Sequence, residues 1–198
     1  MKLYFSPGAC SLSPHIVARE AGLPVETVRV DLRARKTANG EDFLKINPKG
    51  YVPALQLDDG QVLSEGAVIV QYLADKKPDA GLAPKPGTME RYRLQEWLNY
   101  VATELHKGGS QPKGAPPELK DEIRAKLAAK YDFLVGQLEG HDFLLGERFT
   151  VADAYLFTVL TWSKNRGVEL EKWPALKNYF ERIAARPAVR EALQAEKA

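Results

Sequence analysis

The first part of the chain alternates between hydrophobic and polar positions in short runs that predict strands. This alternation covers residues 2–5, where it stops at the turn signal Ser6-Pro7-Gly8, and it returns at residues 25–30. Between the two runs, residues 11–21 predict a helix that Gly22 and a following proline bring to an end. The chain therefore opens with a β-α-β unit.

The pattern continues with short elements. Residues 33–40 are polar and predict a loop, and residues 41–46 allow a short helix. Two short alternating runs, 54–57 and 61–63, flank Asp58-Asp59-Gly60, which is a hairpin signal, and residues 65–76 then predict a helix with one apolar face. The first 77 residues are therefore expected to form a small α/β sandwich.

A shift in composition marks the next boundary. Residues 78–87 hold three prolines and two glycines, and no strand pattern follows them. The fold class predicted is therefore α/β plus all-α, with an N-terminal domain at 1–77, a linker at 78–87 and a helical domain at 88–198. The helices are expected at 89–106, 116–138, 150–164, 174–185 and 188–195.

Composition narrows the class of protein. The 198 residues carry a formal net charge of +2, and 44% of them are hydrophobic, which fits a globular chain and excludes general disorder. No apolar run approaches the roughly 18 residues that a membrane span needs. Basic residues gather in no stripe, so neither nucleic acid nor a membrane is expected as a partner. The first strand begins without a signal-peptide pattern, which predicts a cytoplasmic protein.

The chain has a single cysteine, Cys10, which excludes an intramolecular disulfide, a Cys-rich zinc site and an iron–sulfur cluster. Cys10 lies between a strand end and a helix start, where the helix N-terminus lowers the pKa of a thiol and favours the thiolate. A buried, inert cysteine is the alternative. The position favours a reactive thiol, and with Ser13 in place of a second cysteine the resolving thiol must come from outside the chain.

Two further segments can bind a peptide. Pro53 precedes a strand, and a cis Val52–Pro53 bond would turn the backbone of Val52 outward to pair with an extended peptide; a trans proline starting an edge strand is the alternative. Ser64-Glu65-Gly66 opens a helix, so its amides can hold an anion while Glu65 holds an ammonium group. An ordinary helix cap explains the same three residues.

The helical part offers fewer groups for chemistry. Asn99 and His106 are seven residues apart and would share a helix face, where His106 can donate to a thiolate or transfer a proton; a solvated polar face is the alternative. Thr150 and Asp153 fit a capping box, which makes Asp153 a folding determinant. The remaining histidines have no spacing typical of metal ligands, so no metal is assigned.

Five motifs together resemble the bacterial beta-class glutathione S-transferases over essentially the full chain. The resemblance implies a thioredoxin-like N-terminal domain, a helical C-terminal domain that forms the second-substrate pocket, and a cytoplasmic homodimer active in detoxification. It implies no cofactor beyond glutathione as co-substrate. The motifs are Ser6-Pro7-Gly8-Ala9-Cys10-Ser11-Leu12-Ser13, residues 47–55 (NPKGYVPAL), Ser64-Glu65-Gly66-Ala67, Glu96-Trp97-Leu98-Asn99-Tyr100 with Glu104-Leu105-His106-Lys107, and residues 149–156 (FTVADAYL).

By matching position, the resemblance implies which residues act. Cys10, Ser11 and His106 would stabilise the glutathione thiolate, which attacks an apolar electrophile. Val52, beside Pro53, would pair with the cysteinyl unit, and Cys10 can form a mixed disulfide with glutathione. The implied glutathione-binding residues are Ala9, Arg35, Lys36, Tyr51, Val52, Pro53, Glu65, Gly66, Asn99, Glu104 and Lys107.

One segment departs from the family pattern. Residues 108–114 (GGSQPKG) stand where relatives continue with an aromatic, apolar stretch, which suggests a more open or mobile second-substrate pocket. Conjugation is the leading function. Glutathione-dependent reduction or dehalogenation is an alternative that uses the same thiol chemistry on another substrate. A non-catalytic ligand-binding protein on this fold is the alternative from a different class.

Overall fold

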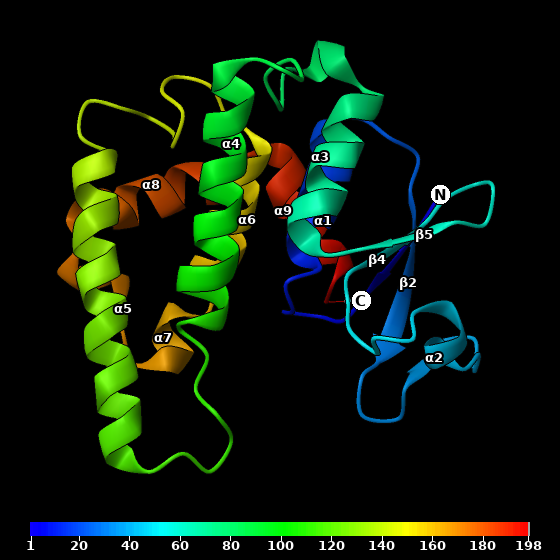
Figure 1. Cartoon of the computed structure of the whole chain (residues 1–198), viewed down its shortest axis with the longest axis horizontal. Coiled ribbons are helices and arrows are strands. Elements are labelled where there is room, and N and C mark those ends of the chain that lie inside the picture. Colours follow the sequence, from blue (N-terminus) through cyan, green and yellow to red (C-terminus); the bar gives the residue numbers. More distant parts are fainter. Residues whose placement is uncertain (198) are drawn as a thin grey trace. The chain divides into compact units, whose positions relative to one another are not determined.

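The computed structural model describes residues 1–197, which divide into two compact units (Figure 1). Unit 1 is Met1–Ala83 together with the residues from Arg186 onward, and unit 2 is Pro84–Ala185. The division after Ala83 falls within the predicted linker. The prediction that 88–198 form a single helical domain is wrong at its end, because helix α9 (Pro187–Ala195) packs on helix α1 (Leu12–Glu20) of unit 1.

Unit 1 contains a mixed sheet whose strands lie in the order β3-β2-β1-β4-β5. Strands β1 and β2 are parallel, and the other neighbours are antiparallel, so the β-α-β opening and the later hairpin are confirmed. Strand β3 lies in the segment predicted as a loop and is too short to show any alternation. The bounds are β1 Lys2–Phe5, β2 Glu26–Asp31, β3 Lys36–Thr37, β4 Ala54–Gln56 and β5 Val62–Ser64.

Alternation along β1 places core side chains on both faces of the sheet. Tyr4 lies on one face, where its ring contacts Phe43 of helix α2 (Phe43–Ile46) at a centroid distance of 5.7 Å. Phe5 points the other way and contacts the ring of His15 in α1. Helix α3 (Gly66–Lys76) packs on α1, and Figure 1 shows α2 on the opposite side of the sheet from both.

Unit 2 is helical, and helix α6 is its most buried element. Every residue of α6 is buried, and its start is the predicted capping box of Thr150 and Asp153. The helices after the sheet confirm the predicted fold class. Their bounds are α4 Met89–Tyr100, α5 Pro117–Gln137, α6 Val151–Leu160, α7 Ser163–Arg166 and α8 Pro174–Ala184, with short 3₁₀ turns at Pro78–Ala80 in unit 1 and Leu170–Lys172 in unit 2.

The helix predicted over 89–106 changes type at its midpoint. After α4, Val101–Lys107 form a π-helix, in which the Gly108 amide donates to the Thr103 carbonyl at 2.8 Å, an i→i+5 bond. A π turn holds more residues than an α turn. The seven-residue spacing from Asn99 to His106 therefore does not complete two turns, and the shared face of the two residues stays a prediction. π-Helical segments are frequent at functional sites.

Membrane-spanning helices and metal-binding clusters are both absent from the described part of the chain. Within residues 1–197, no helix combines the length and the apolar character needed to traverse a bilayer. The same residues contain no group of three or more His, Cys, Asp or Glu side chains arranged to hold a metal ion.

Candidate active site

The Cys10 thiol lies in the loop between β1 and α1, and its position is fixed by hydrogen bonds. Cys10 is half-buried, and its Sγ donates to the Val52 carbonyl at 3.2 Å. The Cys10 carbonyl accepts from the amide and the hydroxyl of Ser13 at 3.2 and 3.0 Å. The thiol is therefore held at the N-terminal end of α1, where the helix dipole favours a negative charge.

Ser11 closes the same loop. Its side chain is buried, and its hydroxyl accepts from the Ser6 amide at 3.2 Å and donates to the Ser6 carbonyl at 3.3 Å. These bonds turn the hydroxyl toward the loop backbone. Ala9 packs against the sheet core, and its amide also donates to Ser6. The Ser11 hydroxyl therefore stabilises the loop that holds Cys10. Its catalytic role stays a prediction.

A buried carboxylate near the end of the chain also supports this loop. Glu196 is 6% exposed; its Oε2 accepts from the Gly8 amide at 3.1 Å, and its Oε1 lies 3.4 Å from His15 Nδ1. Arg19 Nε donates to His15 Nε2 at 3.1 Å, so a neutral His15 carries its proton on Nδ1 and donates it to Glu196. The sequence pattern gives no sign of this contact, because the two helices lie far apart in the chain.

The Val52–Pro53 peptide bond is cis, which decides between the two alternatives left open by the sequence. The Val52 side chain is buried, and its carbonyl is the acceptor for Cys10. The adjacent Tyr51 is 71% exposed, and its carbonyl accepts from Asn47 Nδ2 at 2.8 Å. A peptide that pairs with the Val52 carbonyl therefore either shares this acceptor with the Cys10 thiol or takes the place of the thiol.

Two predicted glutathione contacts have unusual backbones. Within residues 1–197, Arg35 and Glu65 are the non-glycine residues with positive φ, at 55° and 73°. Such conformations cost free energy in most residues and cluster at functional sites. Lys49 Nζ donates to Glu65 Oε1 at 2.8 Å, and the amides of Val68 and Ile69 donate to the Glu65 carbonyl. Glu65 is therefore held by its backbone while its carboxylate stays exposed.

Three more features of the predicted glutathione contacts lie in unit 1: the side chain of Arg35, Lys36 and Gly66. The Arg35 guanidinium lies over Gly50: a Cβ on that glycine would be 2.6 Å from Arg35 Nη1. Lys36 is exposed on β3. Gly66 begins α3, and a Cβ there would make only ordinary contacts with Pro53 and Ser13. This glycine therefore brings the start of α3 next to the cis-proline.

His106 is the most distinctive side chain of the second group, which lies on unit 2. His106 Nδ1 is 2.8 Å from the Tyr155 hydroxyl, and its ring lies 5.0 Å from the ring of Trp162. Desolvation, with smaller contributions from the charges of Lys107 and Arg166, lowers the pKa of His106 from 6.5 to about 4. The imidazole is therefore neutral at neutral pH, able to donate one hydrogen bond and accept another.

The other predicted residues of this group are more exposed. Asn99 is exposed at the end of α4, and its carbonyl accepts from the Thr103 hydroxyl at 3.0 Å. Glu104 pairs with Lys130 at 2.8 Å, and the hydrogen bond from Lys130 lowers the pKa of the Glu104 carboxyl. Lys107 is exposed at the last turn of the π-helix. Sequence reasoning missed Tyr155 as the partner of His106.

The depressed pKa of His106 predicts a pH-dependent loss of stability. Between pH 6.5 and about 4 the unfolded chain binds a proton at His106 that the folded chain does not, so the free energy of unfolding falls as the pH falls through this window. Urea unfolding at pH 7.0 and 4.5 should show a smaller loss of stability for His106→Asn than for the parent protein. Replacement of the exposed His141 by Asn is the control, and parallel losses in all three proteins would contradict the prediction.

The glycines that depart from the family pattern pack tightly on the π-helix. A Cβ on Gly108 would lie 2.4 Å from the Glu104 carbonyl oxygen, and one on Gly109 would lie 2.6 Å from that of Leu105 and 2.8 Å from Arg166 Nη1. Both positions exclude a side chain without a shift of backbone. The start of segment 108–114 thus completes the end of the π-helix, while its expected effect on the second-substrate pocket stays a prediction.

We expect Gly109→Ala to destabilise the protein by about 1–3 kcal/mol, because the methyl group must displace backbone or the Arg166 guanidinium. Gly136→Ala is the matched control: nothing lies within 4 Å of its Cβ position inside α5, so this change should stabilise by about 0.5–1 kcal/mol. Urea unfolding of both variants measures the two free energies. Shifts of the same sign in both would show that helix propensity, and not the close approach, governs position 109.

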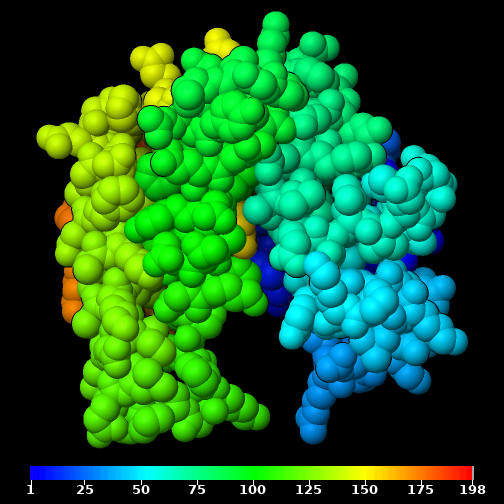
Figure 2. Space-filling model, viewed as in Figure 1, coloured from blue at the N-terminus to red at the C-terminus, as the bar shows by residue number. Residues whose placement is uncertain are grey.

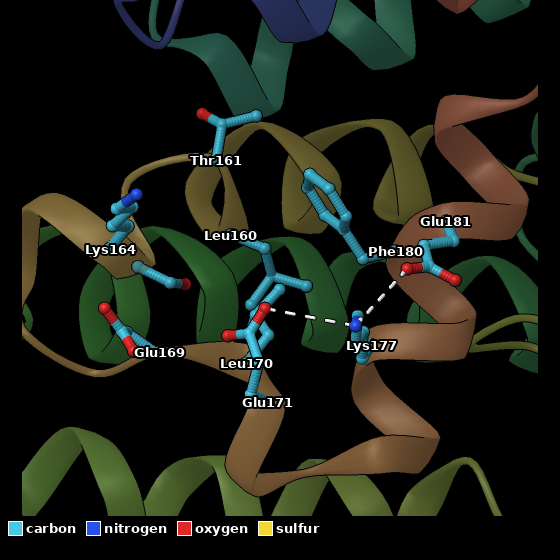
Figure 3. Close-up of a pocket in the computed structure, with 10 residues that line it drawn as sticks. Leu160, Thr161, Lys164, Glu169, Leu170, Glu171, Lys177, Phe180 and Glu181 are labelled. Carbon is cyan, nitrogen blue, oxygen red and sulfur yellow. Dashed lines mark ion pairs between the residues drawn. The ribbon is translucent and has the colours of Figure 1, made fainter.

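The pocket shown in Figure 3 lies elsewhere on unit 2 and has a volume of about 370 Å³. Leu160, Leu170 and Phe180 form its apolar wall, and Lys177 lies between Glu171 and Glu181 at 4.0 and 3.8 Å. The predicted site residues are absent from its lining. The candidate functional residues are therefore the two groups above, each described within its own unit.

Comparison with known proteins matches this geometry to one family. Residues 8–76 match the model of the glutathione S-transferase N-terminal domain, and residues 91–187 match that of the C-terminal domain. Glutathione S-transferase GstA of Escherichia coli O157:H7 is 46% identical over 198 residues, covering 99% of this chain and 98% of its own length. Disulfide-bond oxidoreductase YfcG of Escherichia coli K12 is a more distant relative, 31% identical over 96% of this chain and 93% of its own.

Solved structures give the same match. A sphingomonad glutathione S-transferase complexed with glutathione is 45% identical, with a TM-score of 0.95 over 100% of this chain and 99% of that one. The bacterial beta-class glutathione S-transferase of Sphingomonas chungbukensis is also 45% identical, with a TM-score of 0.94 over 99% and 98% of the two chains.

Proposed function

This chain belongs to the glutathione S-transferase family, and from that premise we propose that it transfers glutathione to apolar electrophiles with Cys10 beside the reacting sulfur. Its thioredoxin-like unit and its helical unit are those of the bacterial beta class. The observation that carries the proposal is the 3.2 Å contact between Cys10 Sγ and the Val52 carbonyl. This contact places a thiol and a strand-pairing acceptor at one point, as recognition of a cysteine-containing peptide requires.

In unit 1 the proposal gives each end of glutathione its own residues. The cysteinyl N–H pairs with the Val52 carbonyl beside Pro53, next to Ala9 and Cys10. Glu65 and the Gly66 amide bind the ammonium and carboxylate of the γ-glutamyl end, where the N-terminus of α3 favours an anion. Arg35 and Lys36, together with Tyr51, bind the glycyl carboxylate. Lys49 Nζ already contacts Glu65 Oε1, and a carboxylate accepts from more than one donor, so the ammonium group can bind beside this ion pair.

In unit 2 the proposal assigns His106 to the glutathione sulfur. A neutral imidazole whose Nδ1 is bonded to Tyr155 leaves Nε2 for a second hydrogen bond. Ser11 keeps the Cys10 loop in place, and Asn99, Glu104 and Lys107 assist binding. The thiolate so stabilised attacks the electrophile and displaces its leaving group.

Thiol–disulfide exchange is a second activity that a specific observation favours. Cys10 is a half-buried thiol at the start of α1, and YfcG, a relative, is named as a disulfide-bond oxidoreductase. Cys10 thiolate would attack a mixed disulfide of glutathione, forming a bond to the glutathionyl sulfur and releasing the other thiol. A second glutathione then frees Cys10 as oxidised glutathione leaves. Reductive dehalogenation would use the same thiol and the same external glutathione.

The proposal also includes a homodimer that works in cytoplasmic detoxification. The homodimer is supported by an aromatic cluster between α4 and α5, two helices whose surfaces adjoin on the face seen in Figure 2. Trp97, Tyr100 and Phe133 make mutual ring contacts at 5.4–6.2 Å, and Phe133 is 47% exposed. Exposed aromatic patches mark interaction surfaces, and sedimentation of the purified protein tests this assembly.

A substitution at Glu65 tests glutathione binding. Glu65→Gln keeps the shape of the side chain but removes the charge proposed to hold the γ-glutamyl ammonium, so we expect the KM for glutathione to rise about tenfold, the factor for one charged hydrogen bond. Retention on a glutathione-affinity column should fall in parallel. Glu26→Gln is the matched control, since Glu26 is also exposed and also pairs with a lysine.

The parent protein supplies the decisive outcome for the proposal as a whole. If it neither binds the glutathione column nor conjugates 1-chloro-2,4-dinitrobenzene, the transferase proposal is wrong, and a non-catalytic ligand-binding protein takes its place. An unchanged KM in Glu65→Gln, with an active parent, would instead remove only the role given to Glu65.

A further inference from the structure

Arg166 is a buried cation at the end of α7. Its residue is 9% exposed, and within residues 1–197 no carboxylate pairs with it. Desolvation lowers the pKa of Arg166, yet a guanidinium stays protonated in proteins. A buried charge without a carboxylate is costly unless other groups compensate for the lost water. The groups that compensate for the buried charge of Arg166 must therefore be among its contacts.

The compensation comes from the end of the π-helix. Arg166 Nη1 donates to the Leu105 carbonyl at 2.9 Å and Nη2 donates to the His106 carbonyl at 3.1 Å. Carbonyls in the last turn of a helix lack partners within the helix and form the negative end of its dipole. Gly109 leaves room for this contact, because a Cβ there would lie 2.8 Å from Nη1. The guanidinium thus donates to the carbonyls of two consecutive residues, and the Ser110 hydroxyl donates to that of His106 as well, at 2.8 Å.

The same side chain reaches the surroundings of the His106 ring. The Arg166 guanidinium lies over the Trp162 ring at 4.9 Å, and that ring also contacts the imidazole of His106 at 5.0 Å. Arg166 is itself fixed, because Gln111 Nε2 and Arg124 Nε donate to its carbonyl at 2.8 and 3.2 Å. One residue therefore holds both the backbone of His106 and a ring that packs against its imidazole.

We propose that Arg166 is a positioning residue, which acts through His106 by fixing its backbone carbonyl and the Trp162 ring against its imidazole. The inference rests on the proposed function, in which His106 binds the glutathione sulfur. Arg166 itself contacts no reacting atom in this scheme. Its loss should change catalysis only as far as His106 contributes to catalysis.

A double-mutant cycle tests this coupling. Arg166→Met keeps an unbranched apolar stem but removes the guanidinium with its charge and donors, and we expect kcat/KM for glutathione with 1-chloro-2,4-dinitrobenzene to fall about tenfold. In the His106→Asn background the same change should lower kcat/KM by less than twofold. Arg166→Lys, which keeps the charge but not the two-pronged geometry, should recover part of the loss. Arg182→Met is the control, because Arg182 also donates to a backbone carbonyl of unit 2, that of Asp142.

A second measurement reports on His106 directly. The titration midpoint of the His106 imidazole by NMR should rise in Arg166→Lys, which keeps the positive charge, because a Trp162 ring that is no longer held against the imidazole lets water reach it. The same variant should leave the His141 titration unchanged. This readout does not depend on activity, and it applies at temperatures where a destabilised variant is still folded.

The outcomes separate the two proposals. If Arg166→Met lowers kcat/KM by the same factor with and without His106, Arg166 acts independently of His106 and the inference is overturned. If His106→Asn leaves kcat/KM unchanged, the role proposed for His106 fails, and the NMR midpoint alone decides whether Arg166 positions it. An unchanged midpoint in Arg166→Lys would overturn the positioning role in that case too.

Discussion

Asp153→Ala should lower the free energy of unfolding by about 4 kcal/mol, which is near the upper end of what a single change costs. Asp153 is fully buried at the start of α6. Its Oδ1 accepts from the Leu144 amide and the Tyr179 hydroxyl at 2.9 and 2.8 Å, and its Oδ2 accepts from the amide and hydroxyl of Thr150 at 2.8 and 2.9 Å. Removal of the carboxylate leaves all four donors buried without an acceptor.

Asp153→Asn sharpens this prediction. Each carboxylate oxygen faces one backbone amide and one hydroxyl, so the amide nitrogen of Asn must face a backbone N–H in either orientation. The near-isosteric change should therefore cost at least half as much as Asp153→Ala. Burial raises the pKa of Asp153 while its four donors oppose that rise, so acceptor geometry is the better guide to its role.

Urea unfolding at pH 7 measures both changes, and Asp121→Ala is the control. Asp121 pairs with Arg124 on an exposed turn of α5, where loss of the ion pair should cost less than about 1 kcal/mol. A loss below about 1 kcal/mol in Asp153→Ala would mean that water or a shift of α6 satisfies the donors. The capping box would then be a local feature without the proposed importance for unit 2.

Local chemistry made this part of the fold predictable. The Thr150–Asp153 box, the alternation in β1 and the Asp58-Asp59-Gly60 turn each depend on residues close together in sequence, and the structure confirms all three. Strand β3 escaped prediction because two residues show no period. Helix boundaries followed from prolines and glycines for the same local reason.

Features that depend on distant contacts could not be predicted. The grouping of α9 with unit 1 depends on Arg186, whose guanidinium binds both carboxylate oxygens of Glu20 at 2.6 and 2.8 Å, and on Glu196, which reaches Gly8. The π-helix depends on the close approach of Gly108 and on a buried arginine supplied by α7. Arginine is seldom buried, so the residue type alone predicts that Arg166 lies at the surface.

The candidate site shows the same contrast. The position of Cys10 before a helix follows from local sequence signals, whereas the sequence left the Val52–Pro53 bond open between cis and trans and the structure decided for cis. The partner of each functional group does not: Tyr155 is 49 residues from His106, and Val52 is 42 residues from Cys10. Sequence identified the residue types that carry the chemistry, whereas the hydrogen-bond partners that tune them required the fold.

Cys10→Ala should separate the two activities of the site by a wide margin. Exchange with a mixed disulfide of glutathione needs a nucleophilic sulfur in the protein, and the chain holds no other thiol, so this rate should fall at least a hundredfold. Conjugation uses the sulfur of glutathione itself, so kcat/KM with 1-chloro-2,4-dinitrobenzene should fall by less than about tenfold. Both rates are measured on the same preparations with glutathione at saturation.

The contact between Cys10 and Val52 explains why glutathione should control this thiol. A hydrogen bond to the Val52 carbonyl stabilises the protonated thiol, while the N-terminus of α1 favours the thiolate. When the cysteinyl N–H of glutathione also donates to the Val52 carbonyl, this acceptor is shared, so the first effect is weakened and the second remains. Alkylation of Cys10 by iodoacetamide should therefore follow a lower pH midpoint when S-methylglutathione occupies the site than when it is absent.

Cys10→Ser provides the matched control, since its hydroxyl can keep a hydrogen bond to the Val52 carbonyl but cannot act as a leaving or attacking sulfur. It should lose exchange as fully as Cys10→Ala and keep conjugation at least as well. A large loss of conjugation in both variants would place Cys10 in the transfer step itself. Exchange that survives in either variant would show that bound glutathione, without the protein thiol, attacks the disulfide.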